Sequence, residues 1–188
     1  MAAGADISDE ELMLCYRDGD AGAFDALYAR HKGGVYRYLL RQCRDAATAE
    51  ELVQDVWMNL IRARAGYTVQ AKFTTYLYRL AHNRLIDHYR RNGHVALVSF
   101  GDEDREEIAE LPDERERPAD DALDARRQAG RLLELIAELP DAQREAFLLQ
   151  QEGGMSVEEI ARATGVNRET AKSRLRYAMA RLRQGMRE

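Results

Sequence analysis

Proline and cysteine, which restrict a chain to particular architectures, are scarce in this sequence. Its 188 residues include three prolines and two cysteines. Because Cys15 and Cys43 have no second cysteine and no histidine at ligand spacing, the sequence supports neither a disulfide framework nor a metal site. The four histidines do not pair with a carboxylate at i, i+4 either. We therefore expect no cofactor, no enzyme activity and no small-molecule substrate.

Long apolar runs are also absent. No stretch approaches the roughly 20 residues that a helix needs to cross a bilayer. Met1 to Ser8 lack the basic start and the apolar core of a signal peptide. We therefore expect a cytoplasmic protein without membrane insertion.

The residues that are abundant favour helices and an uneven charge. Runs rich in Ala, Leu, Arg and Glu lose little side-chain freedom in a helix, and no strand-like alternation competes, so the prediction is an all-α fold. The net charge is −5, but residues 71–95 carry +4, residues 126–188 carry +3 and residues 96–125 carry −9. The acidity is therefore concentrated between two basic zones, each of which could meet nucleic acid.

The first half of the chain predicts consecutive amphipathic helices. Ser8 and Glu11 form a capping box, and a stripe with 3.6-residue spacing follows: Phe24, Leu27, Tyr28, His31, Val35 and Leu39. Thr48 and Glu51 form a second capping box, which predicts a helix with the buried stripe Ala49, Leu52, Val53, Val56, Trp57 and Leu60. Its other face carries Glu51, Gln54, Asp55, Asn59 and Arg62. This face would suit docking onto a basic or mixed-charge helix, although a merely solvated face has the same composition.

A further helix is expected near residues 72–91, and Gly93 ends its pattern. One face is apolar, with Phe73, Leu77, Leu80, Ala81 and Leu85; the other carries Tyr76, Arg79, Asn83, Asp87 and Arg90. Aromatic rings and polar groups that can bond a base edge are what the capture of single-stranded bases requires. Ordinary core packing would explain Tyr76 equally well.

Residues 96–122 predict an acidic linker between two small helical domains, 1–95 and 123–188. The stretch from 96 to 125 holds Pro112, Pro118 and twelve carboxylates. It contains too few large apolar side chains to offset the entropy of ordering, so a solvated tether explains it. Helical patterning resumes near Leu123, pauses at Leu139 and Pro140, and continues through Leu148.

From Gly153 onward the spacing predicts a helix-turn-helix. Ser156 and Glu159 form a third capping box, Gly165 lies where a helix ends in a left-handed conformation, and Asn167 is a good N-cap for the next helix. That helix buries Ala171, Leu175, Ala178 and Leu182. Its other face carries Arg168, Thr170, Lys172, Ser173 and Arg176, which suit the phosphates and guanine edges of a major groove. The alternative is a basic solvated helix that pairs with nearby Glu.

Three segments together resemble the sigma-70 family of bacterial RNA polymerase sigma factors. The fourth conserved region of that family is similar to Leu139-Pro140, Arg144, SVEEIA at 156–161, Gly165 and TAKSRL at 170–175. The segment that grips the clamp helices of the polymerase's largest subunit resembles residues 49–64, AEELVQDVWMNLIRAR. The segment that recognises and melts the minus-ten element resembles residues 73–91, FTTYLYRLAHNRLIDHYRR. Few residues precede the first helix and an acidic linker replaces the domain of larger sigma factors, so the resemblance is to the extracytoplasmic-function (ECF) group.

This resemblance implies a division of labour between the two domains. Sigma region 2, residues 1–95, would bind core RNA polymerase through Glu51, Gln54, Asp55, Asn59 and Arg62. It would also recognise and melt the minus-ten element of promoter DNA through Lys72, Tyr76, Arg79, Asn83, Arg90 and Arg91, although the family often has Trp where Tyr76 stands. Sigma region 4, residues 123–188, would read the minus-thirty-five element through Arg168, Thr170, Lys172, Ser173 and Arg176. The linker could then lie in the path that later holds nascent RNA, and an anti-sigma factor is a further expected partner.

Two other functions compete with a sigma factor. A conventional helix-turn-helix transcriptional regulator, acting without polymerase docking, would explain residues 153–188. It would leave the segments 49–64 and 73–91 as coincidence. An enzyme built on the helical half would need a convergent set of acid, base or metal ligands, which the sequence does not show. The prediction is therefore a non-enzymatic sigma factor.

Overall fold

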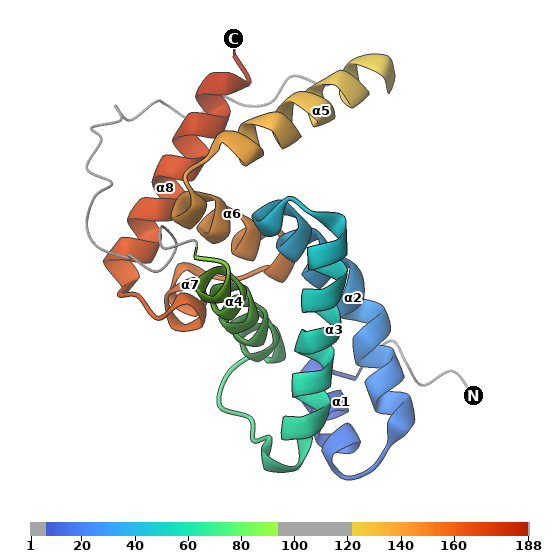
Figure 1. Ribbon diagram of the computed structural model, residues 1–188. Helices are drawn as coiled ribbons and strands as arrows, with labels where there is room; N and C mark the ends of the chain where they lie inside the picture. Colours follow the sequence, from blue (N-terminus) through green and yellow to red (C-terminus); the bar gives the residue numbers. More distant parts are fainter. Residues whose placement is uncertain (1–6, 94–121, 188) are drawn as a thin grey trace.

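The computed structural model describes residues 7–93 and 122–187, with the side chains of 122–124 left aside. Nearly all of the expected linker, 96–122, therefore lies outside the described residues. Within those residues the chain forms α-helices and one 3-10 turn, without strands (Figure 1). The helices are α1 (Asp9–Arg17), α2 (Ala21–Cys43), α3 (Ala46–Ala63), α4 (Phe73–Arg91), α5 (Ala122–Glu138), α6 (Asp141–Gly153), α7 (Val157–Thr164) and α8 (Arg168–Gly185), with the 3-10 turn η1 (Arg64–Gly66) after α3. The expected all-α fold is confirmed.

Helix starts follow from local capping, with one correction. The capping box at Ser8 and Glu11 is present as predicted. Helix α3, however, begins at Ala46, because the Asp45 carboxylate accepts a hydrogen bond from the Thr48 backbone N–H at 2.8 Å. The predicted capping box at Thr48 is therefore wrong: an aspartate three residues earlier supplies the acceptor. The predicted stripe of α3 is buried, apart from the half-buried Val53.

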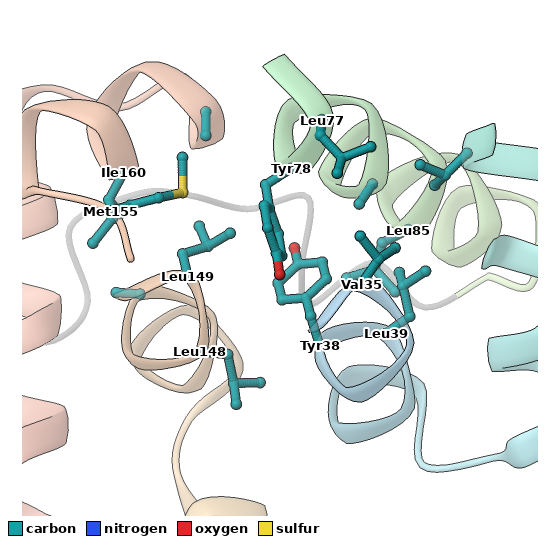
Figure 2. Packing of buried hydrophobic residues seen from close by; sticks show 14 of the residues in the cluster. Val35, Tyr38, Leu39, Leu77, Tyr78, Leu85, Leu148, Leu149, Met155 and Ile160 are labelled. Atoms are coloured by element: carbon teal, nitrogen blue, oxygen red, sulfur yellow. The ribbon is translucent and has the colours of Figure 1, made fainter. Parts of the chain in front are cut away.

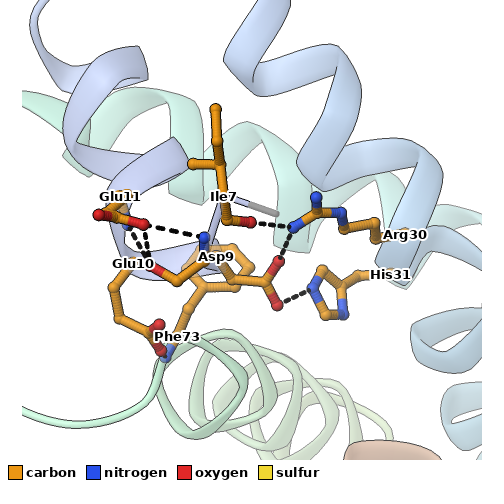
Figure 3. A network of polar contacts seen from close by, with 8 residues as sticks. Ile7, Asp9, Glu10, Glu11, Arg30, His31 and Phe73 are labelled. Carbon is orange, nitrogen blue, oxygen red and sulfur yellow. Dashed lines mark hydrogen bonds and ion pairs between the residues drawn. The ribbon is translucent and has the colours of Figure 1, made fainter. Parts of the chain in front are cut away.

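Helix α1 connects α2 and α4 of the first domain through polar contacts (Figure 3). Asp9 binds two side chains of α2, Arg30 Nη1 at 2.7 Å and His31 Nε2 at 2.7 Å. The Phe73 backbone N–H, at the start of α4, donates to Glu10 Oε1 at 2.6 Å. Because these bonds come from consecutive residues of one helix, α1 fixes where α2 and α4 lie relative to each other.

The second domain contains the predicted helix-turn-helix. Helix α7 begins with the capping box of Ser156 and Glu159 and ends at Gly165, whose φ of +72° is left-handed. Asn167 then caps α8 by accepting from the Thr170 backbone N–H at 2.8 Å. The four apolar residues predicted for the inner face of α8 are all buried. Each of these local predictions is confirmed.

The two domains pack against each other and share one core. Helix α6 contacts α2, and α7 contacts α4, which lies between α7 and α3 (Figure 1). Figure 2 shows Tyr38 of α2 and Tyr78 of α4 facing the side chains of Leu149 and Met155 from the second domain. The sequence predicts two faces for helix α4, but the structure has three: the additional face carries Tyr78 and His82, which are buried where the second domain covers α4.

None of the helices in the described ranges is both long and apolar enough to span a bilayer.

Candidate nucleic-acid interface

Helix α3 presents the polar face that the sequence predicts. Glu51, Gln54 and Arg62 are exposed, and Asp55 and Asn59 are half-buried. The Asn59 amide, with its oxygen toward α4, accepts from Arg84 Nε at 2.7 Å, so it also ties α3 to α4. All five side chains therefore lie on α3, but Asp55 and Asn59 are only partly accessible.

Two apolar side chains near this face are exposed, and sequence reasoning did not assign them to it. Met58 of α3 is 44% exposed and Tyr28 of α2 is 39% exposed. Tyr28 was expected in the buried stripe of α2; instead its ring lies edge-on to Trp57, with the centroids 5.0 Å apart. Docking surfaces commonly combine accessible apolar side chains with a polar rim. The misplacement of Tyr28 arises because a 3.6-residue pattern marks the direction of a side chain but not how far the neighbouring helix covers it.

Helix α4 carries the predicted basic face. Lys72, Arg79, Asn83, Arg90 and Arg91 are all exposed. Lys72 Nζ, however, lies 3.1 Å from Glu159 Oε1 of α7. The first cation of this face is therefore engaged by the second domain.

Tyr76 is half-buried and belongs to an aromatic cluster. Its ring centroid lies 5.3 Å from that of Tyr67 and 6.4 Å from that of Phe73. Burial raises the pKa of Tyr76, and burial with the nearby charge of Glu10 raises the pKa of Tyr67 to about 12. Both phenols therefore keep their protons at neutral pH and can donate hydrogen bonds.

A pocket of about 710 Å³ opens beside this cluster, and no sequence pattern indicated it. It is lined by Ala63, Gly66, Tyr67, Thr68, Gln70, Ala71, Thr75, Tyr76, Arg79 and Arg162. The hydroxyls of Tyr67 and Thr75 are buried and have no hydrogen-bond partner within the described residues. Buried polar groups are nearly always satisfied, by protein groups or by ordered water, so these two hydroxyls do not by themselves indicate a ligand. The segment between α3 and α4 supplies half of the lining residues, and it contains no motif that would reveal this in sequence.

Helix α8 displays the predicted recognition face. One of its residues, Arg168, instead pairs with glutamates, as the alternative interpretation expects. Lys172 and Arg176 are exposed, and Thr170 and Ser173 are half-buried. Arg168 pairs with Glu158 at 2.5 Å and with Glu169 at 3.1 Å. The side chain of Arg168 is 56% exposed, and exposed ion pairs contribute little free energy, so a phosphate could replace the carboxylates.

No group of three or more His, Cys, Asp and Glu side chains suited to a metal ion occurs in the parts of the chain that the structure describes. The predicted DNA-facing residues of α4 and α8 carry aromatic, amide, hydroxyl and cationic groups. Such groups bind phosphates and bases by stacking and hydrogen bonding.

Comparison with known proteins matches both halves of the chain. Residues 27–95 match Sigma-70 region 2, and residues 129–182 match Sigma-70, region 4. The segments 49–64 and 73–91 are therefore not coincidental, which disfavours a conventional helix-turn-helix regulator.

Individual relatives agree with this assignment. The chain is 31% identical over 169 residues to the RNA polymerase sigma factor CarQ of Myxococcus xanthus, which covers 90% of this chain and 92% of CarQ. It is 32% identical over 167 residues to the ECF RNA polymerase sigma factor SigK of Mycolicibacterium vanbaalenii, covering 87% of this chain and 82% of SigK.

A solved structure shows the same fold. It contains the sigma factor RpoE in complex with the anti-sigma factor NepR from Bartonella quintana, and it matches with a TM-score of 0.63 at 21% identity, covering 87% of this chain and 96% of that one. Family regions, relatives and fold agree, and the chain belongs to the ECF sigma factors of the sigma-70 family, which direct RNA polymerase to promoter DNA.

Proposed function

We propose that the two domains act as separate parts of a non-enzymatic specificity subunit in the cytoplasm. Residues 1–95 dock on core RNA polymerase through the polar face of α3 and open the minus-ten element along α4. Residues 123–188 read the minus-thirty-five element through α8, and residues 96–122 connect the two domains. The observation that supports the role of α4 is its exposed side with Arg79, Asn83, Arg90 and Arg91, beside a pocket lined by Tyr76.

The pocket has the chemistry that holding an unpaired base requires. Opening a duplex costs about 1.4 kcal/mol per base-pair step in lost stacking. Stacking of one base on an aromatic side chain returns about 1–3 kcal/mol, so a captured base can offset the opening of its own step. Tyr76 supplies a half-buried ring at the pocket, and the exposed Arg79 supplies a charge for the adjacent phosphate. Asn83, two helical turns beyond Tyr76, offers an exposed amide to a base edge.

Helix α8 reads duplex DNA by a different chemistry. Lys172 and Arg176 lie one turn apart on an exposed face, where cations release counterions from phosphates and donate to guanine. Arg168, Lys172 and Arg176 are exposed on this face of α8, as insertion into a major groove requires.

An anti-sigma factor is the further partner that we propose. The similar sigma factor from Bartonella quintana was solved in complex with one. In this chain the exposed faces of α3 and α4 would be the surfaces for such a protein to cover, because covering them blocks polymerase and DNA together.

Run-off transcription with core polymerase, with and without this chain, tests the function on a fragmented genomic template. Stimulated transcripts are expected, and their absence would contradict the assignment. A second measurement tests the division of labour. Glu51→Lys should weaken core polymerase binding because it reverses a charge on the α3 face, whereas Glu138→Lys, an exposed charge reversal on α5, should leave that binding unchanged. Equal losses in both variants would contradict the role of α3.

A further inference from the structure

The segment between α3 and α4 has a single buried anchor. This pocket segment, residues 64–72, consists of η1 and the six residues after it, and it supplies half of the residues that line the pocket beside Tyr76. Within it only Tyr67 is buried; Ala71 is half-buried and the others are exposed. Because so little of the segment packs against the core, its position depends on the contacts of Tyr67 and of its two ends.

Helix α1 holds the start of the pocket segment. The Arg64 guanidinium lies over the ring of Tyr16 in α1, 5.2 Å from its centroid, and Arg64 Nη1 donates to the Tyr16 hydroxyl at 3.3 Å. Tyr16 is itself buried, with its ring centroid 5.0 Å from that of Phe24 in α2. The start of the segment is therefore attached to a side chain whose own position is fixed by packing.

The same helix holds the end of the pocket segment. Glu10 Oε1 accepts a hydrogen bond from the Phe73 backbone N–H at 2.6 Å, directly after Lys72 (Figure 3). Both ends of the segment are thus bound by residues of α1, six positions apart in that helix.

Arg17, in the last turn of α1, contacts the middle of the pocket segment. Its Nη1 donates to the Tyr67 backbone carbonyl at 3.4 Å, and its Nε and Nη2 donate to the two carboxylate oxygens of Asp18, at 2.8 Å and 3.2 Å. Asp18 thus holds one edge of the planar guanidinium and leaves Nη1 for Tyr67. The hydrogen bonds from Arg17 lower the pKa of Asp18, so the pair is ionised at neutral pH. Because exposed ion pairs add little to the free energy of unfolding, the main effect of Asp18 is to orient Arg17.

Tyr67 connects this pair to the pocket. Tyr67 lines the pocket, and its ring lies edge-on to that of Tyr76 on α4, with the centroids 5.3 Å apart. A shift of the backbone at Tyr67 would therefore move one side of the pocket relative to the other. A binding site must be held within about 0.5 Å of its productive geometry to discriminate between ligands. Arg17 does not line the pocket, so its influence passes through Tyr67.

We propose that Arg17, oriented by Asp18, is a positioning residue for this pocket: it fixes the backbone at Tyr67 and thereby sets how strictly the pocket selects one base of the opened minus-ten element. The inference rests on the proposed function, because selection requires that the pocket holds an unpaired base. Arg17 belongs neither to the polar face of α3 nor to the recognition face of α8. Polymerase docking and minus-thirty-five recognition are therefore independent of it.

Open-complex formation by the holoenzyme tests this inference. A promoter found by run-off transcription is prepared with each minus-ten base of the non-template strand replaced in turn by the other three. Permanganate reactivity of the remaining unpaired thymines measures opening. Arg17→Ala should narrow the preference for the native base at one position about threefold to tenfold, the size of one lost hydrogen bond. Asp18→Asn should narrow it at the same position, because an amide cannot accept from both nitrogens. Preferences at other positions and core polymerase binding should not change.

Matched variants separate orientation from charge. Arg17→Lys keeps the charge but not the planar fork, so it should behave like Arg17→Ala. Arg126→Ala and Asp25→Asn remove the same groups at exposed positions of α5 and α2, and both should keep every base preference. Hydrogen exchange of the free full chain gives a second readout: the backbone amides of residues 64–72 should exchange faster in Arg17→Ala but not in Arg126→Ala.

The outcomes distinguish this inference from the proposed function. An unchanged base preference in Arg17→Ala, or a native preference in Arg17→Lys, would overturn the positioning role. Equal narrowing in Arg126→Ala would overturn it as well, because loss of charge would then be sufficient. Failure of the parent holoenzyme to open any promoter would contradict the proposed function, and base selection with it. Unchanged hydrogen exchange in Arg17→Ala would contradict only the hold of Arg17 on the pocket segment.

Discussion

Glu10 Oε1, in α1, accepts a hydrogen bond from the Phe73 backbone N–H at 2.6 Å and thereby caps α4, which begins 63 residues later. Lys72, the residue before α4, supplies no side-chain cap of its own. The first turn of α4 places Phe73 in the core and Tyr76 at the pocket. The position of that pocket wall therefore depends on a carboxylate in α1.

Glu10→Ala should destabilise the first domain by about 1 kcal/mol, because the start of α4 loses its acceptor. Urea unfolding measures the free energy, and hydrogen exchange at the Phe73 amide reports the local effect. Glu10→Gln, which keeps an acceptor, should lose less. Glu50→Ala, at an exposed site of α3, is the control; an equal loss there would contradict capping by Glu10.

Local signals in the sequence predicted most helix boundaries. Local caps act through neighbours within four residues, so their effect can be predicted from the local sequence. These caps are Ser8, Ser156, Gly165 and Asn167. The start of α3 was misassigned because Asp45 and Thr48 offer competing acceptors and sequence does not rank them. The cap of α4 could not be foreseen, since its donor and acceptor come together only through tertiary packing.

The double variant Lys172→Ala with Arg176→Ala should weaken promoter recognition by about 1–3 kcal/mol for each base that α8 no longer recognises. Core polymerase binding should persist, because the α3 face is untouched. Holoenzyme binding to a promoter with an intact or a scrambled minus-thirty-five element measures the effect.

Arg183→Ala, an exposed cation in the last turn of α8, is the control for charge alone. A comparable defect in this variant would indicate a general loss of phosphate attraction instead of recognition by the α8 face.

Asn83→Ala should reduce open-complex formation at a cognate promoter, since the variant has no exposed amide that can bond a base edge at this position. Permanganate reactivity of unpaired thymines measures opening directly. Gln151→Ala removes an exposed amide from α6 and should leave reactivity intact. Unchanged reactivity in Asn83→Ala would count against base capture at this position.

The contribution of Glu145 to the free energy of unfolding should fall at acid pH. Burial raises the pKa of Glu145, but the charge of His82, hydrogen bonds from His82 and Tyr38, and the charge of Arg174 together hold it below the ordinary value of 4.5. A lowered pKa means that the carboxylate contributes its stability above pH 4.5 and loses it as the pH falls through the lowered pKa.

Urea unfolding between pH 3 and pH 7 measures this contribution as the difference between the native chain and Glu145→Gln. The difference should shrink as the pH falls below 4.5, while the other carboxylates titrate in both proteins and cancel. A difference that grows in acid would contradict the ionised buried state.

The functional faces were only partly predictable, for a physical reason. Residues on the exposed sides of α3, α4 and α8 follow from helical periodicity, and the structure places them on those sides. The pocket at Tyr67 and Thr75 arises where a loop, a helix end and a second domain meet, so no single segment encodes it. The same holds for His82, whose burial is decided by a helix from the other half of the chain.

Residues 92–121 join the two domains in one chain, and this connection changes how strong their interface must be. Two domains of one chain meet at an effective concentration that can reach about millimolar, far above the concentration of a protein in solution. An interface too weak to hold separate fragments together can therefore keep α6 and α7 in contact with α2 and α4 in the intact chain. A ligand that needs the two domains apart competes with this intramolecular contact, and not with the association of two free proteins.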